Sequence, residues 1–210
     1  MSSFFIIFIL ANCTSQTVKI KPELKHSPLI NKTPIPIGVY YPPSFREYQC
    51  TSKDEMFKLE TRFFIGPACV NLLNKILPVM FSRVEIFNTK PPYYSQNQNV
   101  SAVLEPEIHA FQIDSPMDYG GLGSSLGYYS SATFLIKFYD MNGAMIDSWS
   151  ISGNGYERYL YFKNPVNLKK RSAESAVIDT VAQFMVSFQH RKLIMQWLQE
   201  NGFNKDSISR

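Results

Sequence analysis

The feature that most constrains the fold is a hairpin pattern over residues 132–152. Apolar side chains stand at every second position from Ala132 to Phe138, which is the period of a strand with one buried face. Asn142-Gly143 follows, and this dipeptide tolerates the positive φ angles that tight hairpin turns need. Residues 144–152 then read as the return strand, with Trp149 on its apolar face. Part of the protein is therefore expected to be an antiparallel sheet.

Three more strands are predicted by the same alternation, at residues 35–41, 83–87 and 100–113. Pro36 lacks an amide donor, so the first of these strands should begin there or lie at a sheet edge.

Two helices are predicted from apolar residues at three- and four-residue steps. Gly66-Pro67 should open the first helix, and Pro78 should kink or stop it. Its core-facing stripe consists of Val70, Leu73, Leu77 and Met80. The second stripe consists of Ala173, Val177, Val181, Phe184 and Phe188. We therefore predict an α+β fold, a mixed, largely antiparallel sheet of four to five strands with two helices packed on one face.

The N-terminus combines a short apolar run, Phe4 to Ala11, with a cysteine at position 13. The run is far shorter than the roughly 20 residues that span a bilayer, and it has the length of the apolar core of a secretory signal. Leu10-Ala11-Asn12-Cys13 resembles the lipobox of bacterial lipoproteins, in which the cysteine is diacylated and becomes the new N-terminus. The alternative is an apolar strand or core helix with an incidental cysteine.

The lipobox reading divides the chain into four parts. These are a signal peptide at 1–12, a lipidated tether at 13–33, an α/β sandwich domain at 34–203 and a tail at 204–210.

The other two cysteines, Cys50 and Cys69, flank an 18-residue segment. An even pair in an exported protein is a disulfide candidate, and closing a loop of this length stabilises by roughly 3 kcal/mol. The alternative is two separate buried thiols that behave as small apolar groups. The net charge of +4 is too small to indicate a nucleic-acid partner.

The order of these elements resembles a group of Gram-negative outer-membrane lipoproteins with a fold similar to the anticodon-binding domain. The resemblance rests on the lipobox, the tether, the IPIGVYYPP strand, the first helix running into RVEIF, and the hairpin followed by a long C-terminal helix. The group includes the curli-secretion lipoprotein, the activator lipoprotein of a peptidoglycan synthase, and accessory lipoproteins of envelope transport systems. The resemblance implies a periplasm-facing outer-membrane protein that is held by lipid at Cys13 and binds other envelope proteins.

One strand suggests chemistry. Glu105, Glu107 and His109 alternate along it, so all three should project from one face, about 7 Å apart. That spacing suits a carboxylate pair for glycoside hydrolysis or a metal site. The favoured reading is a solvated sheet face, with Leu104, Ile108 and Ala110 packing on the other side.

A second candidate surface interleaves aromatic residues with cations, the residue types enriched at the energetic centres of interfaces. Its predicted partner-binding residues are Tyr156, Arg158, Tyr159, Tyr161, Lys169, Lys170 and Arg171. The same chemistry suits glycan or anionic headgroups, and the alternative is an edge strand followed by a solvated helix start.

We therefore expect a non-enzymatic structural or accessory subunit of an envelope secretion or transport complex, with no metal or cofactor. The alternatives are a regulator of peptidoglycan synthesis and an envelope glycan hydrolase that uses Glu105 and Glu107.

Overall fold

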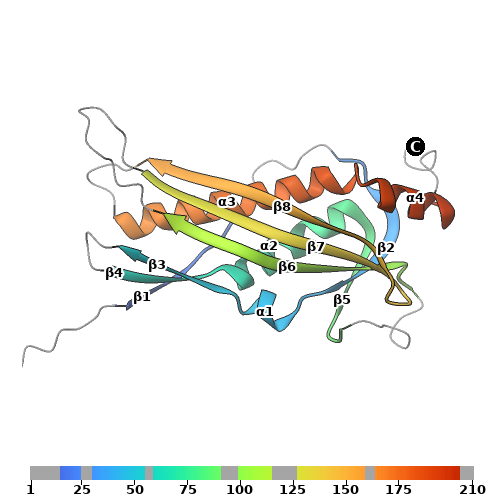
Figure 1. Ribbon diagram of the computed structural model, residues 1–210, viewed down its shortest axis with the longest axis horizontal. Helices are drawn as coiled ribbons and strands as arrows, with labels where there is room; N and C mark the ends of the chain where they lie inside the picture. The colour runs from blue at the N-terminus through green and yellow to red at the C-terminus, as the bar shows by residue number, and fades with distance from the viewer. Residues whose placement is uncertain are drawn as a thin grey trace, which may run out of the picture.

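The computed structural model describes residues 15–24, 30–54, 59–90, 99–114, 127–158 and 164–203. Its larger sheet has five strands in the order β5-β2-β6-β7-β8 (Figure 1). Strand β2 pairs in parallel with β5 and β6, whereas β6–β7 and β7–β8 are antiparallel. The bounds are Thr33–Tyr40 for β2, Phe81–Phe87 for β5, Ala102–Asp114 for β6, Gly127–Asp140 for β7 and Met145–Arg158 for β8. The predicted α+β fold with a mixed sheet is confirmed.

Two helices, α2 (Ile65–Met80) and α3 (Pro165–Phe188), cover one face of this sheet (Figure 1). Both predicted stripes face the core, although Val70 is only partly buried. Pro78 lies inside α2, which ends two residues later, so the helix stops near it as predicted. No helix in the described ranges is long and apolar enough to cross a membrane.

Glycines of β8 allow α3 to lie close to the sheet. A Cβ added at Gly153 would overlap Thr180, and one added at Gly155 would overlap the Ser172 carbonyl. The Ser172 hydroxyl bonds across the contact, donating to the carbonyl oxygen of Gly155 (3.0 Å) and lying 2.8 Å from Oγ of Ser130. Gly153 and Gly155 therefore occupy core-facing positions of β8 at which the backbone of α3, and not a β8 side chain, fills the space.

A second sheet, in the order β1-β4-β3, was not predicted. Its strands are β1 (Ser15–Lys19), β3 (Gln49–Asp54) and β4 (Leu59–Phe64), and the four-residue helix α1 (Pro43–Arg46) precedes β3. They are short and mostly polar, so none has a strong apolar period.

The segment expected to be a tether is instead packed on the domain over its described residues. Strand β1 pairs in parallel with β4, and Val18, Ile20 and Pro22 are buried. The Lys21 amide donates to Oε1 of Glu174 on α3 (2.7 Å). The tether prediction is corrected because Val18 and Ile20 are buried in the core, in and just after a strand that pairs with β4.

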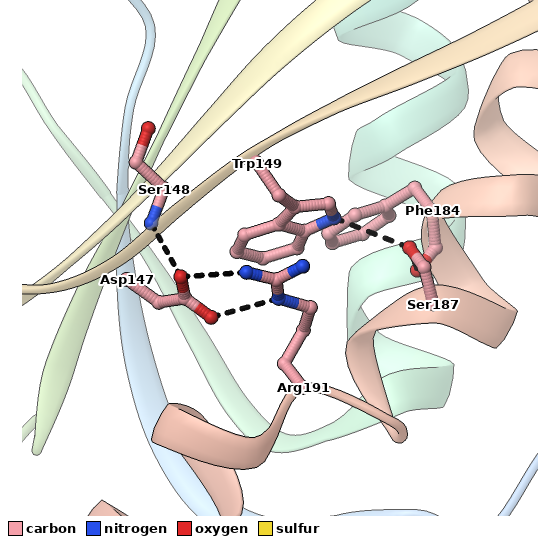
Figure 2. A network of polar contacts seen from close by, with 6 residues as sticks. All are labelled: Asp147, Ser148, Trp149, Phe184, Ser187 and Arg191. Atoms are coloured by element: carbon pink, nitrogen blue, oxygen red, sulfur yellow. Dashed lines mark hydrogen bonds and ion pairs between the residues drawn. The ribbon is translucent and has the colours of Figure 1, made fainter.

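The C-terminal helix α4 (Lys192–Glu200) is attached to the sheet through Arg191 (Figure 2). Arg191 Nε and Nη2 each donate to a carboxylate oxygen of Asp147 on β8, both at 2.8 Å. The guanidinium lies over the Trp149 ring at 5.3 Å. Hydrogen bonds from Arg191 and from the Ser148 amide hold the pKa of Asp147 below its usual range.

Candidate functional site

The sheet face opposite the helices carries hydroxyl, amide and aromatic side chains. Towards the end of β8, Thr133 and Ser152 lie 3.0 Å apart through their hydroxyl oxygens. The next positions along the same face bring Ser131 opposite Asn154 and Tyr129 opposite Tyr156. This part of the outer face is a polar surface that ends in two tyrosines.

Tyr129 and Tyr156 form an exposed cross-strand pair, with 40% and 50% of their surface accessible. The Tyr129 hydroxyl donates to Oδ1 of Asn154 at 2.6 Å. The Tyr156 ring lies against Gly127, where an added Cβ would overlap it. Both rings are therefore held in place before any ligand arrives, which lowers the entropic cost of binding.

Sequence reasoning identified Tyr156 but missed Tyr129. The sequence predicts the hairpin but not this pairing. The Asp140 amide donates to the Ala144 carbonyl oxygen (2.9 Å), so the turn is longer than the Asn142-Gly143 dipeptide, and the register shifts again between Phe138 and Tyr139. Only after this shift does Tyr129 lie opposite Tyr156.

The cations predicted to join this surface divide into two groups. Arg158 and Arg171 are exposed, and Lys170 is partly buried beside Glu174 at 3.9 Å. Lys169 is only 1% exposed, with Nζ over the Tyr128 ring at 5.4 Å. The prediction of Lys169 as a contact residue is corrected, because it lies on the core side of α3. Tyr159 and Tyr161 lie outside the described residues.

We define the tyrosine–arginine strip as Tyr129, Tyr156 and Arg158. These three exposed side chains lie at the end of the sheet where β7 begins and β8 ends.

The carboxylate cluster of β6 differs from the expected solvated face. Glu105 is only 5% exposed, and burial raises its pKa above the usual range, while nearby Lys137 and Lys90 lower it. Within the described part of the chain, its Oε2 has no hydrogen-bond partner. Glu107 instead accepts a hydrogen bond from Lys137 Nζ at 2.8 Å.

His109 does not join this pair, because the register of β6 against β7 shifts between Ile108 and Ala110. His109 is exposed. In the described ranges no three His, Cys, Asp or Glu side chains are grouped to hold a metal ion.

The apolar cluster on the same face explains why Glu105 is buried. It consists of Tyr40, Phe87, Val100 and Val103, with Met141 packed against it. Val103 precedes Glu105 by two positions on β6, so the two side chains lie on one face.

The expected disulfide is absent, since Cys50 and Cys69 are both free cysteines. The Cys50 thiol lies 3.5 Å from the Phe111 carbonyl oxygen of β6, to which it donates. Cys69 is fully buried inside α2. Burial raises the pKa of Cys50 to about 11 and also raises the pKa of Cys69. The alternative of two separate buried thiols describes the structure better.

A hollow of about 300 Å³ lies where the N-terminal segment crosses α2. Its charged lining residues are Lys21, Glu23 and Lys75, and Asn71 adds an amide. The Glu105–Glu107 pair is not part of it.

Comparison with known proteins identifies the fold but no family. No family model matches the chain, and no curated protein sequence is detectably similar to it. A neuraminyllactose-binding hemagglutinin homolog from Helicobacter pylori has a similar structure, with a TM-score of 0.50 and 13% identity over 86% of this chain and 97% of that one. This likeness shows a shared fold.

Two other solved structures have lower similarity. A DUF330 protein from Xanthomonas campestris has a TM-score of 0.49 and 9% identity, covering 88% of this chain and 98% of that one. A minor lipoprotein from Acinetobacter baumannii has a TM-score of 0.41 and 17% identity, covering 76% of this chain and 91% of that one.

Proposed function

We propose that this protein is a lipid-anchored lipoprotein of the Gram-negative envelope and acts there as a non-enzymatic structural or accessory subunit. The observation that carries the proposal is the lipobox-like tetrapeptide ending at Cys13, directly ahead of a folded domain. The partners would be envelope proteins of a secretion or transport complex. The outer membrane is the proposed location because the lipoproteins that the chain resembles are found there.

A binding role is supported by the form of the candidate surface. The two exposed tyrosines lie side by side on an open sheet face, and the Tyr129 hydroxyl is already bonded to Asn154. The protein from Helicobacter pylori that shares this fold is also named for binding.

The test of the anchor is the Cys13→Ser variant expressed in a Gram-negative host. Wild-type protein should carry acyl mass and fractionate with membranes, whereas the variant should be unmodified and released. Ser15→Ala, which changes an exposed residue next to the anchor, is the matched control and should remain acylated. Wild-type protein with no acyl mass would overturn the proposal.

The test of the role is native co-purification of the acylated protein. An accessory subunit should bring down a defined envelope protein in constant ratio. A regulator of peptidoglycan synthesis is distinguished when that partner is a synthase.

The glycan hydrolase alternative has its own observation, because Glu105 and Glu107 have different environments on one strand. When two carboxyl groups have different environments, their pKa values differ, so that one can act as an acid and the other as a base. Glu105→Gln and Glu107→Gln should leave the cellular phenotype unchanged if the protein only binds. Loss of the phenotype in folded variants would favour the hydrolase.

A further inference from the structure

We infer that the tyrosine–arginine strip faces the lipid surface that holds the acyl chains of Cys13. This inference rests on the proposed lipid anchor. It identifies the occupant of the strip as a phospholipid headgroup layer and gives the domain a fixed orientation on the membrane.

Strand registers place the anchor and the strip at the same end of the molecule. Ser15 begins β1 opposite Glu60, next to the turn between β3 and β4. Strand β3 runs along the end of β6, since Cys50 contacts Phe111 and Ser52 contacts Ile113. Strand β6 ends at Asp114, which pairs with Tyr129 of the strip. Figure 1 shows the start of β1, the ends of β3, β6 and β8, and the start of α3 together at the left.

The chain between the anchor and the fold is very short. Cys13 precedes Ser15 by two positions, and two residues span at most about 7 Å. A free tether over residues 13–33 would instead extend to roughly 70 Å. Because β1 is paired with β4 and followed by the buried Ile20, the domain cannot move far from its lipid.

The strip has the chemistry of a membrane interface. Tyrosine concentrates at the headgroup level because its ring is apolar and its hydroxyl is polar. Arg158 adds a cation, and a basic side chain near an anionic leaflet is attracted to it. Asp114 and Glu157 lie beside the strip and reduce the net positive charge of this surface. The inference therefore rests mainly on the two tyrosines and on the nearby anchor, and less on charge.

The opposite end of the molecule points away from the membrane in this orientation. It holds the β7–β8 turn and α4, as Figure 1 shows at the right. Leu193 on α4 is exposed and marks that end.

The orientation can be measured with a fluorophore on a new cysteine in the full acylated chain. Gln112→Cys marks the anchor end and Leu193→Cys the far end, and the protein without a new cysteine measures any labelling of the partly buried Cys50 and the buried Cys69. The labelled proteins are placed in vesicles of three parts phosphatidylethanolamine to one part phosphatidylglycerol, with a nitroxide on the headgroups. The label at 112 should be quenched several-fold more than the label at 193.

Intact mass separates the two proposals. If the protein carries no acyl mass, the proposed anchor fails. If it is acylated but both labels are quenched equally, the anchor stands and the orientation is overturned.

Contact by the strip is tested with Tyr129→Ser and Tyr156→Ser together. Quenching at 112 should fall by at least half, while Ile86→Ser with Val186→Ser, two exposed apolar residues elsewhere, should leave it unchanged. Inserting twenty Gly and Ser residues between Thr14 and Ser15 should also reduce it, because a flexible linker frees the domain. If the tyrosine variant keeps its quenching but loses a co-purifying protein, the strip is a protein interface and the inference is overturned.

Discussion

Glu105 illustrates how tertiary packing buries a side chain that the alternation of its strand predicts to be exposed to solvent. Its strand position is on the outer face, yet the apolar cluster of Tyr40, Phe87, Val100 and Val103 lies beside it. Burial then raises its pKa. An acid with a raised pKa in the folded state stabilises the fold most below its unfolded pKa, and this contribution is lost as the pH rises through the folded value.

Glu105→Gln should therefore raise the free energy of unfolding at pH 7, by about 1 kcal/mol. The difference from wild type should shrink as the pH falls below the usual glutamic acid pKa of 4.5, because the carboxyl is then increasingly protonated in both the folded and the unfolded state. Urea unfolding at a series of pH values measures it. Glu107→Gln is the control, since it removes the negative charge that pairs with Lys137 and should give no such gain. A variant less stable than wild type at pH 7 would contradict the argument.

The thiols give a second prediction at this scale. Alkylation requires the thiolate, so a pKa of about 11 leaves Cys50 with roughly a hundredfold less reactive form at pH 8 than a thiol of pKa 9. In folded protein Cys50 should react slowly and Cys69 more slowly still. After unfolding without reductant both should be alkylated, as peptide mass mapping would show. If both cysteines resisted alkylation after unfolding and reacted only once a reductant was added, a disulfide between them would be demonstrated.

At the scale of elements, an ion pair joins the start of α4 to the sheet, and the buried Ile194 and Leu198 hold the rest of the helix on the core. Arg191 joins the helix start to Asp147 and covers Trp149, as Figure 2 shows. Breaking a buried pair costs about 3–5 kcal/mol, and the partial exposure of Arg191 reduces this to about 2 kcal/mol.

Arg191→Met should lower stability by about that amount and speed amide exchange in α4. The pKa of Asp147 is lowered, so its contribution is present above the usual value of 3.8 and disappears as the pH falls through the folded pKa. The loss should therefore be largest near neutral pH and small in acid. Gln196→Ala, which removes only an exposed contact with Glu200, should change neither measurement.

At the scale of the whole molecule, the N-terminal segment is part of the domain. Ile20 is buried against the core, so Ile20→Ala should cost about 2–5 kcal/mol. Thr17→Ala, at an exposed position of β1, should cost less than about 0.5 kcal/mol. Thermal unfolding compares the two variants. Equal stability of both would restore the tether interpretation.

The sequence by itself determined the hairpin, the two helical stripes and the mixed sheet. Apolar periodicity and the Asn142-Gly143 turn are local, so residues close in the chain carry the information. Gly202, just past the end of α4, has a φ of 81°, the left-handed conformation that glycine adopts most readily at a helix end.

Only the tertiary structure decided the second sheet, the burial of Lys169 and Glu105, and the shared end of Ser15 and the two tyrosines. The strands of the second sheet are short and have no strong apolar period, and although β3 and β4 pair locally, β1 pairs with β4 from a distant part of the chain. Burial of a charged side chain likewise depends on which neighbours the packed elements bring to it, and neither condition leaves a periodic signal in the sequence.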